Sequence, residues 1–113
     1  MTPPEYYILA ALAMKDTHAY ILCQKVTRDS GGTVTSSRGA MSKLLRRLTE
    51  EDYIAPLAGS SRPQLYKLTD YGHKRLEQET RQHQRAVIVG QTALAQAARY
   101  HNEASAAVSV YDS

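Results

Sequence analysis

Tryptophan, phenylalanine and cysteine are absent or scarce in this chain, and the scarcity of cysteine excludes two kinds of site. The 113 residues include no Trp, no Phe and a single cysteine, Cys23. One cysteine permits neither an intramolecular disulfide nor a metal site built of cysteines alone. The four histidines have no metal-ligand spacing among themselves or with Cys23. We therefore expect no metal and no cofactor, and we expect Cys23 to be a buried small hydrophobe.

Signals for membrane insertion, secretion and catalysis are also missing. The apolar run at residues 6–14 is far too short to span a bilayer, and the residues before it are not a basic signal region. There is no glycine-rich phosphate loop, nucleophile elbow or pair of catalytic carboxylates, and the acidic run at residues 50–52 is simpler as a helix end. The expectation is a cytoplasmic protein that is not an enzyme.

Positive charge is concentrated in the middle of the chain. Residues 38–75 carry eight Lys or Arg and four Asp or Glu, whereas the rest carries six and seven. The formal net charge of +3 therefore comes from this segment. Because neutralisation of phosphates supplies most non-specific affinity for DNA, this distribution favours a nucleic-acid surface.

Residues 38–48 predict an amphipathic helix with one apolar and one basic face. Met41, Leu44, Leu45 and Leu48 fall on one stripe at helical spacing. The opposite face and its flanks carry Gly39, Ser42, Lys43, Arg46, Arg47 and Glu50. A basic helix followed by a hairpin is how a winged helix presents itself to DNA. A basic face that is merely solvated is the alternative.

The surrounding sequence predicts three more helices and a hairpin. Helices are expected at about residues 2–14, 18–26 and 70–102. Thr2 and Asp16-Thr17 are the expected N-caps of the first two, Ser36 or Ser37 is the expected N-cap of the basic helix, and Thr69-Asp70 opens the last. The first helix should bury Ile8, Leu9, Leu12 and Ala13. Residues 53–57 and 64–68 read as hairpin strands, residues 33–35 as an extended segment against the hairpin, and residues 103–113 as a frayed or loosely docked tail.

These elements predict a mainly α fold with a small β-hairpin, namely a winged helix-turn-helix with a long C-terminal dimerisation helix. The expected DNA-binding domain is residues 1–69, and the dimerisation helix and tail are residues 70–113. Small and apolar residues recur on the last helix at the spacing of a partner-facing seam. The seam consists of Val87, Gly90, Leu94, Ala97, Ala98 and His101.

Three strings in order resemble the PadR family of bacterial transcriptional regulators. His18-Ala-Tyr20 resembles that family's His-Gly-Tyr, and residues 39–48 resemble its Gly-Thr-Leu-Tyr-Pro-x-Leu-x-x-Leu recognition helix. Residues 65–69 with Gly72 resemble its Tyr-Tyr-x-Leu-Thr-x-x-Gly. The match covers about residues 6–76. It implies the short-tailed branch, whose single C-terminal helix swaps into a two-fold dimer. Ser42-Lys43 replaces Tyr-Pro on the DNA-facing part, so the operator is expected to differ from family examples.

The candidate DNA contacts lie on the predicted recognition helix and hairpin. They are Ser37, Arg38, Gly39, Ser42, Lys43, Arg46, Arg47, Arg62 and Lys67. Arg and Lys commonly read guanine in the major groove, and Ser42 suits either a base edge or a phosphate. Gly39 has two explanations, close approach of phosphate or steric relief beside the helix cap.

A second group of residues suits a ligand between two subunits. It consists of Tyr6, Tyr7, Gln91, Leu94 and Tyr100. The resemblance implies a central cavity in members that sense ligands, and a small aromatic or apolar effector is the expected occupant. Simple packing of the tyrosines is the alternative.

The leading hypothesis is a homodimeric repressor that binds double-stranded DNA at a pseudo-palindromic operator and has no membrane partner. Two further possibilities stay open: a winged helix used as a protein-interaction module, and an architectural DNA binder without sequence preference. The salt dependence of binding to random duplex DNA separates the interaction module from the DNA binders.

Overall fold

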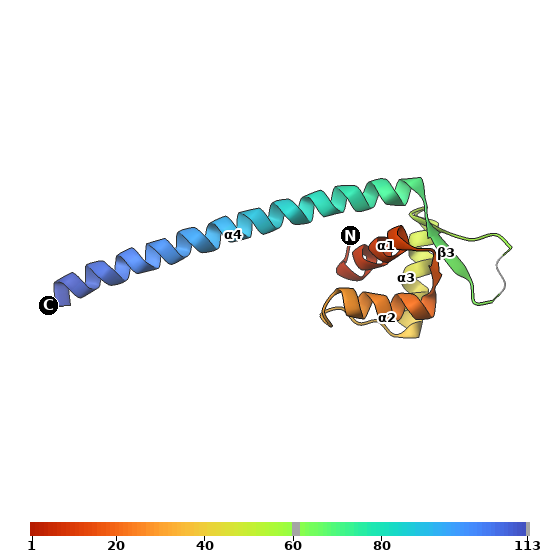
Figure 1. Ribbon diagram of the computed structural model, residues 1–113, viewed down its shortest axis with the longest axis horizontal. Coiled ribbons are helices and arrows are strands. Elements are labelled where there is room, and N and C mark those ends of the chain that lie inside the picture. The colour runs from red at the N-terminus through yellow and green to blue at the C-terminus, as the bar shows by residue number, and fades with distance from the viewer. Residues whose placement is uncertain (60–61, 113) are drawn as a thin grey trace. The chain divides into compact units, whose positions relative to one another are not determined.

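The structure, a computed structural model, describes residues 1–59 and 62–112, and the side chains of residues 105–112 are not among those described. The elements are α1 (Pro3–Met14), β1 (Thr17–His18), α2 (Ala19–Asp29), α3 (Arg38–Glu50), β2 (Ile54–Pro56), β3 (Leu65–Leu68) and α4 (Asp70–Asp112) (Figure 1). The predicted fold class is confirmed: a winged helix with a small antiparallel sheet is followed by a long C-terminal helix. The chain divides into two compact units, Met1–Glu79 and Thr80–Ser113.

The sheet contains one strand more than the predicted hairpin. Strands β2 and β3 pair antiparallel, with Ile54 opposite Leu68, and β1 pairs with the other edge of β3, with His18 opposite Leu65. Two predictions are wrong here. Residues 17–18 form β1 instead of capping α2, and it is β1, not residues 33–35, that lies against the hairpin.

The side chain of Ser30 explains why the segment after α2 is not a strand. Its hydroxyl accepts a hydrogen bond from the amide of Val34 at 3.0 Å and lies 3.2 Å from the carbonyl oxygen of the same residue. Both backbone groups of Val34 are therefore satisfied locally, without a neighbouring strand. Helix α2 runs to Asp29, beyond the predicted range of 18–26, and stops before two glycines with positive φ, Gly31 and Gly32.

The apolar faces of α1, α2 and α3 pack together with β2 to form the core. The fully buried large side chains are Ile8, Leu9, Leu22, Val26, Met41, Leu45, Leu48 and Ile54. Three expectations need correction: Ala11 is buried in place of Ala13, which is exposed, and Leu44 and Cys23 are only half-buried. Ala11 and Ala13 lie on opposite flanks of the stripe formed by Ile8, Leu9 and Leu12, so the stripe alone does not decide which of the two is buried.

The two ends of the chain also differ from expectation. The Thr2 hydroxyl donates to the Glu5 carboxylate at 2.8 Å and makes no cap hydrogen bond to the backbone. Helix α4 continues to Asp112, so the backbone of the predicted frayed tail is helical, while its side chains from residue 105 lie outside the described ones. No Gly or Pro occurs after Gly90 to stop the helix, and alanines favour its continuation.

A hydrogen-bonded junction joins the end of α3, the hairpin and the start of α4. Helix α3 ends at Glu50, Asp52 follows with a positive φ of 64°, and the amide of Tyr53 returns to the carbonyl oxygen of Leu48 at 3.0 Å. The Tyr53 carbonyl oxygen accepts from the Thr69 amide at 3.1 Å and lies 3.0 Å from the Thr69 hydroxyl. That hydroxyl also accepts from the Gly72 amide at 2.9 Å, so Thr69 caps α4.

Gly72 allows this junction to close. A Cβ atom at this position would overlap the Tyr53 carbonyl oxygen and would meet the Leu68 side chain at 2.8 Å. The residue must therefore be glycine, although it lies in the first turn of a helix, where glycine is otherwise unfavourable.

We expect Gly72→Ala to lower the free energy of unfolding by about 1–3 kcal/mol, because the added methyl group must displace backbone as well as a side chain. Urea denaturation measures this change. The matched control is His73→Ala, an exposed neighbour whose replacement should cost less than about 0.5 kcal/mol. Equal stability of the two variants would contradict the close contact.

Candidate nucleic-acid interface

Helix α3 buries one face in the core and presents the other to solvent. Met41, Leu45 and Leu48 are buried, whereas Lys43 and Arg46 are exposed. No residue of the described part of the chain makes an ion pair or hydrogen bond with the side chain of Lys43 or Arg46. Two cations one helical turn apart are therefore available to an external partner, as the sequence pattern predicted for the exposed face.

The start of α3 is held by Ser37. Its side-chain oxygen accepts from the Ala40 amide at 3.1 Å, so Ser37, and not Ser36, is the N-cap. The helix then begins at Arg38, and its first turn contains no acidic residue. The positive end of the helix dipole is thus not neutralised by a carboxylate of its own first turn, an arrangement that favours an approaching anion.

Arg47 differs from the other basic residues of α3, because its guanidinium is engaged by two carboxylates. Its Nε lies 3.2 Å from Oε1 of Glu51, and a terminal nitrogen lies 3.9 Å from Oε1 of Glu5. Glu5 is 3% exposed, and an ionised carboxylate is costly to bury unless it is compensated. Arg47, together with the Thr2 hydroxyl, supplies that compensation. The ion pair of Arg47 with Glu5 joins α1 to α3 across 42 positions of sequence, so no local sequence pattern predicts it.

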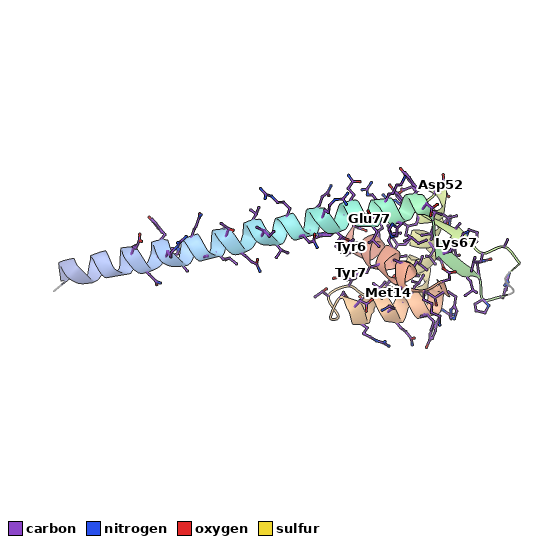
Figure 2. All side chains as sticks on the ribbon, turned by 45° about the horizontal axis from the view of Figure 1, so that its top comes forward. Tyr6, Tyr7, Met14, Asp52, Lys67 and Glu77 are labelled. Atoms are coloured by element: carbon purple, nitrogen blue, oxygen red, sulfur yellow. The ribbon has the colours of Figure 1, made fainter. Side chains whose placement is uncertain are left out.

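The hairpin contributes two exposed basic residues. Lys67 lies on β3 opposite Ala55, and Arg62 follows residues 60 and 61, which lie outside the described residues. Figure 2 shows the Lys67 side chain on the hairpin. Both side chains are exposed, as a wing that contacts DNA requires.

A cluster of aromatic and charged side chains, which the sequence analysis did not predict, lies at the junction. The rings of Tyr53 and Tyr71 stack with centroids 5.0 Å apart, and Arg75 donates to the Tyr53 hydroxyl at 3.1 Å and to Glu79 at 2.9 Å. Burial raises the pKa of the Tyr53 hydroxyl, against the lowering effect of the Arg75 charge. Burial lowers the pKa of Arg75, but the hydrogen bonds and charges of Glu79 and Tyr53 together outweigh it, so the pKa of Arg75 is raised. Tyr53 therefore stays protonated and Arg75 stays charged at neutral pH.

The residues predicted to line the effector site are divided between the two units, and the predicted dimer seam lies in the second unit. Tyr6 and Tyr7 belong to the first unit, where their rings meet edge to face at 5.8 Å (Figure 2). Gln91, Leu94 and Tyr100 belong to the second unit, in which every residue of the predicted seam is exposed. Leu94 is 73% exposed, an unusual state for a leucine, and the effector site and the seam stay predictions.

Two other features are absent from the described part of the chain, a metal site and a membrane-spanning helix. Among the described residues, no group of three His, Cys, Asp or Glu side chains is placed to hold a metal ion. Across the same residues, no helix combines the length and apolar character needed to cross a membrane.

A winged helix with a basic, solvent-facing recognition helix defines a class of regulatory proteins. Comparison with known families shows to which family of this class the chain belongs. The model of the transcriptional regulator PadR-like family matches residues 8–78, and the chain belongs to this family. The match covers α1 to the first turns of α4, close to the range over which the sequence resembled PadR regulators.

Solved structures share the fold at low sequence identity. A PadR family regulator from Clostridium difficile is 19% identical with a TM-score of 0.70, over 82% of this chain and 99% of that one. A PadR-like regulator from Bacillus cereus is 23% identical with a TM-score of 0.68, over 80% and 89%. Bacillus subtilis PadR, solved in complex with operator DNA, is 21% identical with a TM-score of 0.59, over 67% and 45%. The comparison with curated proteins found no match.

We expect Ser37→Ala to lower the free energy of unfolding by about 1 kcal/mol, because the Ala40 amide loses its only side-chain acceptor. Thermal or urea unfolding measures the loss. Ser36→Ala is the matched control, since the Ser36 hydroxyl bonds only the neighbouring carbonyl of Ser37. A larger loss of stability in Ser36→Ala than in Ser37→Ala would mean that Ser36, and not Ser37, caps α3.

Proposed function

We propose that this regulator is a repressor that binds a pseudo-palindromic operator in double-stranded DNA as a homodimer. The observation that carries the proposal is the exposed face of α3, where Lys43 and Arg46 have no partner within the described residues. A helix with one face buried in the core and unpaired Lys and Arg side chains on the other face suits insertion into the major groove of DNA.

The proposed footprint assigns a role to each part of the basic surface. Lys43 and Arg46 contact base edges, preferentially guanine, and Ser42 bonds a base edge or a phosphate. Arg38 and Ser37 contact the backbone at the start of α3, and Arg62 and Lys67 do so from the hairpin. Arg47 is left out of this footprint, because its guanidinium already serves Glu5 and Glu51. The operator complex of Bacillus subtilis PadR supports DNA as the ligand.

We further propose that α4 pairs with α4 of a second copy. Apolar side chains left exposed on a long helix indicate an interface, and Val87, Leu94 and Tyr100 are each more than half exposed. Small residues at Gly90, Ala97 and Ala98 allow two helices to approach closely. Two recognition helices related by a two-fold axis then require half-sites about 34–36 Å apart, or a multiple of this distance.

The proposed switch is a small aromatic or apolar effector that binds between the subunits. Tyr6, Tyr7, Gln91, Leu94 and Tyr100 are the residues proposed to line its site. Binding there releases the repressor only if the effector prefers the arrangement that cannot bind DNA. By linkage, effector and operator must weaken each other's binding by the same factor.

The experiment that tests the proposed function measures binding to random and operator duplexes over a range of salt. Contacts to several phosphates predict a steep loss of affinity between low and moderate salt, together with preference for the operator. A protein that ignores duplex DNA even at low salt is a protein-interaction module instead. Steep salt dependence with no sequence preference indicates an architectural binder.

We expect Lys43→Ala and Arg46→Ala each to weaken operator binding by roughly 5- to 150-fold, as loss of a base contact does. Melting temperatures should stay nearly unchanged, because both side chains are exposed. Arg85→Ala is the matched control, since it removes the same charge from an exposed position on α4. If Arg85→Ala weakens binding as much as Arg46→Ala, overall charge and not the face of α3 determines affinity.

We expect Leu94→Asp to convert the dimer into monomers, because an unpaired carboxylate in a helix–helix contact is costly. Size-exclusion chromatography with light scattering measures the mass. Gln96→Asp is the matched control, since Gln96 lies on the opposite face of the same helix turn. A dimer that survives Leu94→Asp moves the interface elsewhere, first of all to α1.

A further inference from the structure

The fold itself accounts for four of the six glycines in this chain. Gly31, Gly32 and Gly59 have positive φ, and Gly72 closes the junction against the Tyr53 carbonyl. The two that remain, Gly39 and Gly90, lie in helices with ordinary φ. Apart from its chain neighbours and the backbone of its own helix, a Cβ atom added to either one would have no heavy atom of the described residues within 4 Å. Gly90 lies on the face of α4 proposed above to meet a second copy, so Gly39 alone has no explanation.

Gly39 is unfavourable for folding and nothing in the described chain requires it. It is the second residue of α3, it is exposed, and glycine weakens a helix relative to alanine at such a position. Steric relief from other parts of the described chain does not explain it, because no heavy atom of those parts lies within 4 Å of the place of its missing side chain. An open, destabilising glycine on an exposed helix face is explained by a partner that needs the room.

We infer that Gly39 is where the sugar–phosphate backbone of DNA comes closest to α3. The inference rests on the proposed function. Gly39 shares its face with Lys43 and Arg46 at a spacing of four and seven residues, so a partner that meets these side chains also faces Gly39. The neighbouring Arg38 is exposed, and its side chain has no partner among the described residues.

A phosphate is the part of DNA that suits this position. The Ser37 hydroxyl accepts from the Ala40 amide but donates its own proton to none of the described residues, so it is free to donate to a phosphate oxygen. Together with Arg38 it supplies the donors that backbone contacts use. A side chain at position 39 would hold the backbone away from both donors and lift the first turn of α3 out of the groove. The loss of affinity is therefore steric and independent of base sequence.

The test is a size series at one position, with folding and DNA binding measured on the same variants. Gly39→Ala should raise the melting temperature by about 2–6 °C. It should also weaken binding to a selected operator and to random duplex DNA alike, by roughly 5- to 100-fold. Gly39→Leu should weaken both further. The matched control, Ala13→Leu, adds similar bulk to an exposed position on α1 and should leave both affinities unchanged.

Each other outcome overturns the inference. If Gly39→Ala binds DNA as tightly as the unmodified protein, the backbone does not approach this position, although the proposed function stands. A lower melting temperature for Gly39→Ala means that the fold needs the glycine. If only operator binding weakens and random duplex is bound as before, the position meets a base edge instead. An unmodified protein that binds no duplex DNA removes the proposed function together with the inference.

Discussion

The carbonyl group of Tyr53 is the point at which α3, the hairpin and α4 are held together. It accepts from the Thr69 amide at 3.1 Å and lies 3.0 Å from the Thr69 hydroxyl, and Gly72 packs directly against it. Tyr53 stands between the end of α3 and the start of β2, and Thr69 stands between the end of β3 and the start of α4. One acceptor and one threonine therefore fix the geometry of three elements, and a single side chain at Gly72 would prevent it. Conformational freedom at this point would separate the recognition helix from the hairpin.

A small number of contacts also fixes both ends of the recognition helix, α3, in the absence of DNA. Ser37 caps the start of α3, the positive φ of Asp52 closes its end, and the ion pair of Arg47 with Glu5 ties its flank to α1. Since these contacts and the buried stripe are already formed, little backbone entropy remains to be lost on binding. The side chains that are left unengaged, Lys43 and Arg46, are the ones that an external anion or base edge can use. The same arrangement therefore holds the buried face of α3 rigid and leaves the basic side chains of its exposed face available to a partner.

Local patterns predicted the helices and the hairpin, and long-range contacts decided the rest. The spacing of Met41, Leu45 and Leu48 was enough to assign both faces of α3, and Thr69-Asp70 was recognisable as the start of α4. Strand β1 was missed because two residues show no period, and because its partner, β3, lies nearly fifty positions away. The Glu5–Arg47 pair and the stack of Tyr53 on Tyr71 had no local signal for similar reasons. Sequence therefore predicted which residues of the site are basic and exposed, but not which of them are engaged inside the protein.

The central claim of this account is that two copies of α3, related by a two-fold axis, read one operator. Hydroxyl-radical footprinting of the unmodified protein on a selected operator tests it most directly, because protection reports which sugars are covered on each strand. We predict two equal protected patches, related by a dyad, whose centres are about 34–36 Å apart or a multiple of this distance. A single protected patch, or two patches without two-fold symmetry, would contradict the claim.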